Sequence, residues 1–181
     1  MKLILARIWR TLGFKTNIQL LFMRIFNDEF LVGLTGIFFN DHDQVLLVKH
    51  SYREIQWSLP GGYLKAGEHP IEGLEREIAE ETRFIVSVDK QLKIRTDRKT
   101  GRLDMCYMGK FIGGEFKSSE EVIDYGMFSF DELPLLLKDQ VIFIDYALKQ
   151  WRRMKIKQQP EIAHKEPFFK NFWEKWNYKK A

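Results

Sequence analysis

The stretch GYLKAGEHPIEGLEREIAEETRF, from Gly62 to Phe84, carries most of the information about fold and function in this chain. Gly61 and Gly62 follow Pro60, which indicates a turn whose backbone can bend tightly or approach a ligand closely. Pro70 suits the first position of a helix, because its missing N–H would have no partner there. The sequence therefore predicts a loop followed by a short helix.

This helix would place acidic and apolar residues on neighbouring faces. At about 100° per residue, three carboxylates share one arc: Glu77, Glu80 and Glu81. The adjacent arc is apolar and would pack: Ile71, Leu74 and Ile78. Like charges at this spacing destabilise a helix by about 0.2–0.5 kcal/mol per pair, so a counter-charge is expected. It could be a divalent cation such as Mg²⁺ or Mn²⁺, which prefer oxygen ligands, or the acidic face could be solvated and neutralised by Arg76 and Lys65.

The spacing of the whole stretch resembles a family signature. Gly62, Glu68 and the run Arg76-Glu77-Ile78-Ala79-Glu80-Glu81 match the Nudix hydrolase box, G-x5-E-x7-R-E-U-x-E-E-x-G-U, where U is apolar. Arg83 stands where the box has its late glycine, which affects how the helix ends and leaves every acidic position intact. The preceding Trp57 to Gly61 also looks like the approach to that box.

The resemblance implies an α/β protein, a Nudix-like α/β/α sandwich with a mixed β-sheet, that hydrolyses a nucleoside diphosphate linked to another group. Nucleotide sugars, ADP-ribose-like compounds and related nucleotides stay open. Lys99, Thr100 and Gly101 occupy the neighbourhood where some ADP-ribose or diadenosine polyphosphate hydrolases carry a proline or tyrosine. The competing interpretation is a binding protein on the same scaffold, without turnover.

The carboxylates suit phosphoryl transfer, which needs charge neutralisation more than covalent help. We expect Mg²⁺, with Mn²⁺ as a substitute, on Glu77, Glu80 and Glu81. A further carboxylate would deprotonate the attacking water, and the candidates are Glu120 and Glu121, with Glu80 able to serve in their absence. By resemblance, Gly62, Glu68 and Arg76 are expected to support the metal-binding residues from behind, and Glu68 and Arg76 would tie the loop to the helix. These roles predict a site built from one helix and one distant loop.

Residues just ahead of the box could meet the substrate. Lys49, Tyr52 and Arg53 offer cationic and aromatic side chains to phosphate and base, although they could equally be ordinary loop residues. A base could stack on Tyr52 or Phe39, but aromatic residues in strands are more often core. His50 and His69 lack a second histidine at metal-ligand spacing, so zinc is not expected.

Length and composition limit the number of domains and the class of protein. At 181 residues with 45% apolar residues, one domain with a sizeable core is expected. The single cysteine, Cys106, fits a reducing cytoplasm and is expected to be buried and inert. No apolar run reaches the ~18–20 residues of a membrane span.

The two ends of the chain are basic. Residues 1–28 form a basic amphipathic segment, with helical spacing at Ile4, Ile8 and Leu12, and residues 149–181 interleave basic and aromatic side chains. We expect both basic segments to pack on the domain at residues 29–148, or on a second subunit in a homodimer. Docking on RNA or on an anionic membrane surface is the alternative.

Outside the box the pattern is mostly that of strands. Apolar and β-branched runs predict strands at residues 31–39, 45–48, 84–88, 91–96, 103–111 and 122–130. The sequence Asp131-Glu132-Leu133-Pro134 predicts the start of a helix with an acidic first turn. Glu120 and Glu121 fall in the polar loop ahead of the last strand.

Overall fold

The structure is a computed structural model that describes residues 30–97 and 100–158. The expected N-terminal amphipathic segment and residues 159–181 of the basic, aromatic C-terminal segment lie outside the described residues. The proposed roles of both basic segments therefore stay predictions.

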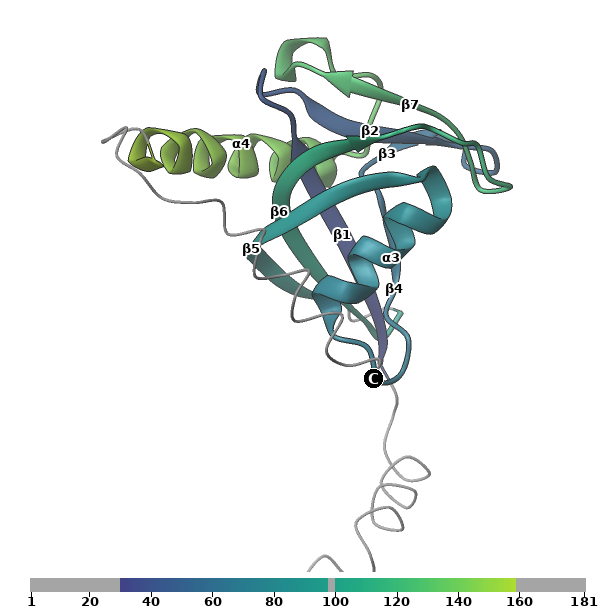
Figure 1. Cartoon of the computed structure of the whole chain (residues 1–181). Coiled ribbons are helices and arrows are strands. Elements are labelled where there is room, and N and C mark those ends of the chain that lie inside the picture. Colours follow the sequence, from purple (N-terminus) through teal and green to yellow (C-terminus); the bar gives the residue numbers. More distant parts are fainter. Residues whose placement is uncertain (1–29, 98–99, 159–181) are drawn as a thin grey trace, which may run out of the picture.

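A mixed sheet of seven strands forms the centre of the domain (Figure 1). The strands are β1 (Leu31–Phe39), β2 (Val45–His50), β3 (Trp57–Ser58), β4 (Gly61–Tyr63), β5 (Phe84–Asp97), β6 (Arg102–Gly114) and β7 (Val122–Phe128). Their main order is β3-β2-β1-β6-β5, with β4 beside β1 and β7 beside β2. Among the strands that the structure describes, β1 pairs with β6 in parallel, and the other pairings are antiparallel.

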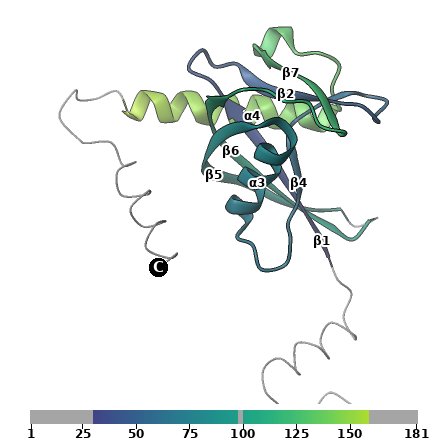
Figure 2. The same ribbon diagram turned by 45° about the vertical axis from the view of Figure 1, so that its right-hand side comes forward.

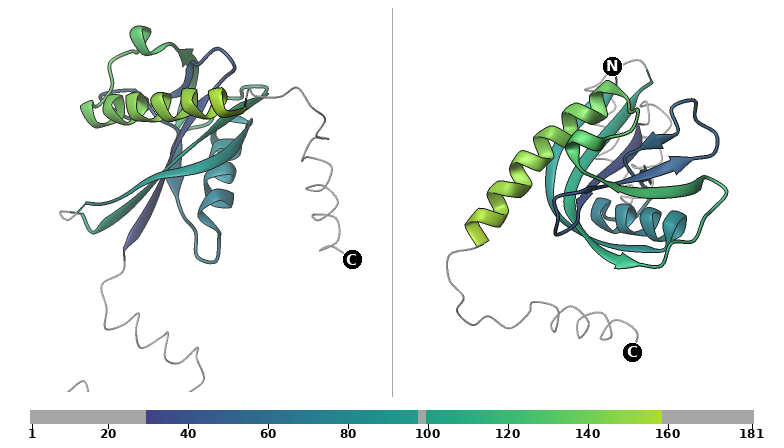
Figure 3. Two further views of the ribbon diagram at one scale, coloured as in Figure 1. Left: turned by 90° about the vertical axis from the view of Figure 1, so that its left-hand side faces the viewer. Right: turned by 90° about the horizontal axis from the view of Figure 1, so that it is seen from above.

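Two helices cover opposite faces of this sheet. Helix α3 (Pro70–Thr82) packs on one face and α4 (Lys138–Gln158) on the other, as the view from above shows (Figure 3). The strands alternate accordingly: Phe38 and Tyr107 join the core beneath α3, whereas Phe39 and Met108 join the core beneath α4. The expected α/β/α sandwich with a mixed sheet is confirmed.

Helix α3 begins and ends as its sequence indicates. Pro70 is its first residue, and His69 caps it by accepting a hydrogen bond from the Ile71 backbone N–H at Nδ1. Arg83 adopts the left-handed conformation at φ 65° and donates its N–H to the Ala79 carbonyl. The box departure at Arg83 therefore keeps the cap geometry that glycine usually supplies.

The turn between β1 and β2 matches the expected one, and it anchors α4. The Asn40 side-chain oxygen accepts hydrogen bonds from the backbone N–H groups of His42 and Gln44. Asp43 accepts from the Trp151 indole, and its carboxylate also pairs with Arg152 and Lys155. The second half of α4 is thus held across the end of the sheet (Figure 2).

Two expectations for the second half of the chain were wrong. No helix starts at Asp131: a 3-10 turn covers Phe130–Glu132, and α4 begins only at Lys138. Leu133 is extended because it precedes Pro134, and this interrupts the helix. The strands expected at 84–88 and 91–96 form one strand, β5, with register shifts between Ile85 and Lys93.

The expected border between domain and C-terminal segment lies inside α4. The helix continues without a break through residues 148 and 149, and Trp151 beyond that border is buried in the core against Phe39. The last part of the described chain is therefore structurally continuous with the domain.

Candidate active site

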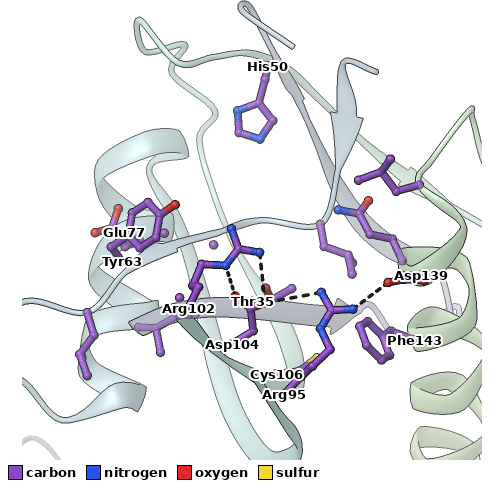
Figure 4. A pocket seen from close by; sticks show the side chains of 18 of the residues that line it. Thr35, His50, Tyr63, Glu77, Arg95, Arg102, Asp104, Cys106, Asp139 and Phe143 are labelled. Atoms are coloured by element: carbon purple, nitrogen blue, oxygen red, sulfur yellow. Dashed lines mark hydrogen bonds and ion pairs between the residues drawn. The ribbon is translucent and has the colours of Figure 1, made fainter. Parts of the chain in front are cut away.

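A pocket of about 750 Å³ opens beside the loop that precedes α3 and extends over the sheet to the start of α4. One part of its wall comes from α3, from β4 and from the loops after β2 and before β7. The other part comes from β1, β5, β6 and α4 (Figure 4). The two parts differ in chemistry, with carboxylates dominant in the first and cationic groups in the second.

Glu81 is the central carboxylate of the acidic end. It lines the pocket with Glu77 and Glu121, and its Oε2 is buried without a hydrogen-bond partner among the described residues. Burial raises the pKa of Glu81 to about 7, and the negative charges of Glu121 and Glu77 add to the effect. A buried carboxylate in this state needs either a proton or a cation.

Arg76 supplies the positive charge that the rest of the acidic face requires. Its guanidinium forms ion pairs with Glu68 at 2.6 Å, Glu77 at 2.8 Å and Glu80 at 2.9 Å. Glu68 also accepts a hydrogen bond from the Lys65 backbone N–H, so it ties the loop to the helix. Arg76 and Glu68 thus hold the box together, and Lys65 reaches Glu80 at 3.7 Å.

Gly62 leaves room for one of these carboxylates. A Cβ placed on Gly62 would lie 2.5 Å from both Cδ and Oε2 of Glu77. Any side chain at this position would therefore displace the Glu77 carboxylate.

The donor chemistry fits a divalent cation, although the side chains do not form a closed cage. Among the described residues, no three carboxylate, histidine or cysteine side chains converge as a ready-made cation site. The reason is that Arg76 draws Glu77 and Glu80 to itself, while Glu81 keeps an unpartnered oxygen. Glu77, Glu80 and Glu81 are hard oxygen donors on one helix face, which is the kind of set that Mg²⁺ binds together with substrate phosphates.

The two loop carboxylates predicted as candidate bases differ in their position relative to the pocket. Glu121 lines the pocket, whereas Glu120 is not among the lining residues. Ser51 fixes this loop, because its backbone N–H donates to the Glu121 carbonyl and its hydroxyl donates to the Glu120 carbonyl. The structure therefore brings Glu121, and not Glu120, to the pocket with Glu81.

Two of the three substrate-binding candidates line the pocket, and the third does not. Tyr52 and Arg53 line the pocket, and the Arg53 guanidinium lies 5.6 Å from the centre of the Tyr52 ring. Lys49 does not line it, because its ammonium lies over the Trp57 ring at 5.9 Å. Phe39 is 1% exposed in the core and is inaccessible to a base.

His50, which stands with Lys49, Tyr52 and Arg53 just ahead of the box and had no specific role predicted for it, also lines the pocket. Its Nε2 lies 2.9 Å from the Ser58 hydroxyl, which also accepts from Arg53 at 3.3 Å. Burial lowers the pKa of His50 to about 4, and the nearby Arg53 charge contributes. A neutral His50 therefore helps to place Arg53, and no periodicity in the sequence signals that role.

The second part of the pocket was missed too, because its residues come together only through strand register. Arg102 and Asp104 on β6 and Arg95 on β5 share one sheet face with Cys106. Cys106 is buried as expected, and burial raises the pKa of its thiol to about 12.

The fold and the carboxylate site define this chain as a member of the Nudix family, since the NUDIX domain model matches residues 30–151. Members of this family act on phosphoric anhydride bonds, and the chain is a hydrolase of this type. Nudix enzymes generally use divalent metals such as Mg²⁺.

Individual relatives differ in the substrate they are named for. An ADP-ribose pyrophosphatase of Methanocaldococcus jannaschii is 30% identical over 128 residues, covering 67% of this chain and 74% of the relative. A human 8-oxo-dGDP phosphatase is 30% identical over 88 residues, covering 48% of this chain and 27% of the relative. A crystal structure of a UDP-X diphosphatase, 24% identical, superimposes with a TM-score of 0.60 and covers 77% of this chain and 73% of its own.

Among the described residues, no helix is both long and apolar enough to cross a membrane. The cytoplasmic location and the homodimer stay predictions.

Proposed function

We propose that this protein is a metal-dependent pyrophosphohydrolase that cleaves the diphosphate bond of a nucleoside diphosphate linked to another group. The observation that carries this proposal is the buried, unpartnered Oε2 of Glu81, which faces a pocket beside two further carboxylates. Such a group suits an acid that must hold a cation or a water against a phosphate.

The roles of the residues follow from their positions. Glu77, Glu80 and Glu81 would hold Mg²⁺ or Mn²⁺, which when bound neutralises phosphate charge and lowers the pKa of a coordinated water. Glu121 would take the proton of the attacking water from the facing loop. Arg53 would bind a phosphate oxygen, held in position by Ser58.

Arg76 and Glu68 would keep the box in shape when a cation arrives. Arg76 pairs with three carboxylates at once, so it can release Glu77 or Glu80 and still remain bound to Glu68. This arrangement lets the acidic face exchange one positive partner for another at small cost.

The substrate class rests on the size of the pocket and on the relatives. A volume of about 750 Å³ lies in the range that holds a nucleotide with a further group. The relatives are named for ADP-ribose, 8-oxo-dGDP and UDP-linked substrates, which share a nucleoside diphosphate.

A hydrolysis panel tests this function. The purified protein with Mg²⁺ or Mn²⁺ would be given nucleoside triphosphates, nucleotide sugars, ADP-ribose, dinucleoside polyphosphates, 8-oxo-dGDP and capped RNA, with products identified by phosphorus NMR. We expect a nucleoside monophosphate to be released from a diphosphate-linked compound. Folded protein that cleaves nothing in the panel would contradict the proposal and support a binding protein.

A further inference from the structure

The part of the pocket away from the carboxylates carries a concentration of positive charge. Its cationic side chains come from three elements, β5, β6 and α4: Lys93, Arg95, Arg102 and Lys138. Within the described part of the chain, two carboxylates line the same part of the pocket, Asp104 and Asp139. We call these six residues the distal cationic site.

The two arginines are held in place by the two acids. Arg102 contacts Asp104 through Nε at 2.7 Å and Nη2 at 3.1 Å, and Arg95 lies 3.5 Å from the same carboxylate. Arg95 also pairs with Asp139 at the start of α4, at 2.7 Å. The two guanidinium groups and the two carboxylates therefore form a chain of ion pairs that crosses from β6 to α4 (Figure 4).

The lysines provide the uncompensated charge. Neither Lys93 nor Lys138 forms an ion pair within residues 30–97 and 100–158, and Lys93 lies over the Phe143 ring at 5.5 Å. Two free ammonium groups beside a fixed arginine pair would attract an anion that enters the pocket.

Gly33 shows that the packing accommodates this arrangement. A Cβ on Gly33 would lie 2.7 Å from Oδ1 of Asp104 and 3.7 Å from Cδ of Arg102. The Asp104 carboxylate and the Arg102 stem therefore cover the bare backbone of β1, which a larger residue would prevent.

Strand register sets the separation between the two ends. Tyr63 on β4 pairs with Gly33 on β1, Gly33 with Asp104 on β6, and Asp104 with Arg95 on β5. Three strand spacings amount to roughly 14 Å. Glu77 adjoins β4, so an anion held by the ammonium groups of Lys93 on β5 and Lys138 on α4 would lie away from the carboxylates, whereas the Arg102 side chain contacts Tyr63 on β4 and lies between the two ends.

We propose that the distal cationic site binds a second anionic group, a phosphate or a carboxylate, on the part of the substrate remote from the scissile diphosphate. This inference rests on the proposed function, because it assumes that the diphosphate lies at the Glu77 and Glu81 end. It narrows the substrate class to nucleoside diphosphate derivatives with an extra negative charge on either the nucleoside or the other group.

The test uses two pairs of compounds that differ in one anionic group. ADP-ribose and its 2′-phosphate differ on the nucleoside side, whereas UDP-glucose and UDP-glucuronate differ on the other side. The dissociation constant of each would be measured by calorimetry in EDTA, where no metal-dependent turnover occurs, and kcat/KM would be measured with Mg²⁺.

We expect the charged member of one pair to be preferred about tenfold or more, as a charge-assisted contact predicts, and the preference to shrink with added salt. The double substitution Lys93→Gln with Lys138→Gln should bring that ratio close to one. The matched control is Lys90→Gln with Lys149→Gln, one lysine on β5 and one on α4 that do not line the pocket, and it should keep the ratio.

Equal affinity within both pairs would overturn the proposal, as would a preference that survives the loss of Lys93 and Lys138. The two proposals fail separately. A charge preference in binding without any hydrolysis would contradict the enzymatic function alone, whereas hydrolysis without a charge preference would contradict the distal cationic site alone.

Discussion

His50 is the side chain whose protonation the fold clearly opposes. It is 2% exposed, and burial together with the Arg53 charge lowers its pKa from 6.5 to about 4. The unfolded chain therefore binds a proton at His50 between these two values, whereas the folded chain does not. Stability should consequently fall as the pH drops from 6.5 towards 4, by at most about 1.4 kcal/mol per pH unit from this group.

Urea unfolding at a series of pH values measures this effect. The variant His50→Gln should show a shallower loss of stability across that interval than the wild type. The control His42→Gln changes an exposed histidine in the turn between β1 and β2, and it should keep the wild-type slope. Identical slopes for the wild type and His50→Gln would show that His50 is protonated equally in both states.

Arg83 has a backbone conformation that costs conformational free energy for a residue with a side chain. It holds the left-handed conformation at φ 65° at the end of α3, where glycine would be relaxed. We expect Arg83→Gly to raise the free energy of unfolding by about 0.5–1 kcal/mol and Arg83→Ala to change it little. Thermal or urea unfolding of the three proteins would check this, and a destabilised glycine variant would contradict it.

At the scale of elements, the contact between β4 and α3 controls where Glu77 lies. A Cβ on Gly62 would meet the flexible end of Glu77, whereas a Cβ on Gly61 would meet the Leu34 carbonyl oxygen at 2.0 Å. Gly62→Ala should therefore fold and lose at least about tenfold in turnover, because Glu77 is displaced. Gly61→Ala should lose about 2 kcal/mol or more of stability, because the backbone itself must move.

Measuring both unfolding and kcat/KM separates the two glycine variants. A Gly62→Ala protein with wild-type kcat/KM would show that turnover does not depend on the exact position of the Glu77 carboxylate.

The docking of α4 depends on one acidic residue in the turn between β1 and β2. Asp43 accepts the Trp151 indole N–H and pairs with Arg152 and Lys155; burial opposes ionisation, but these contacts lower its pKa overall. We expect Asp43→Gly, which suits the positive φ of 60°, to cost about 2 kcal/mol of unfolding free energy, and Asp43→Asn about half of that. Equal stability of both variants and the wild type in urea would rule out this anchor.

The elements themselves were largely predictable from the sequence. Pro70 and the alternation of apolar residues gave α3 and most strands, because local signals dominate there. The helix expected at Asp131 failed because Pro134 forces Leu133 into an extended conformation. The continuity of β5 was hidden because bulges interrupt its period of two.

At the scale of the whole molecule, the sequence indicated one end of the pocket and not the other. Glu77, Glu80 and Glu81 share one face of α3, which their spacing alone predicts. Arg95 and Asp104 lie on the consecutive strands β5 and β6, but their pairing depends on a register that bulges shift, and Arg95 meets Asp139 of α4 only in the tertiary fold. The position of Glu121 in the pocket likewise depends on a loop that is joined to Ser51, which is remote in sequence.

Glu81 is expected to support metal-dependent cleavage of a diphosphate. The most direct measurement is the rate of nucleoside monophosphate release from the preferred substrate of the panel, with Mg²⁺ and with EDTA, for the wild type, Glu81→Gln and Glu75→Gln. Glu75 is on the same helix and does not line the pocket, so its variant controls for the loss of a carboxylate from α3. We predict that the wild type and Glu75→Gln turn over only with Mg²⁺ and that folded Glu81→Gln loses at least about a hundredfold in kcat. Turnover of Glu81→Gln close to that of the wild type, or full activity in EDTA, would contradict the claim.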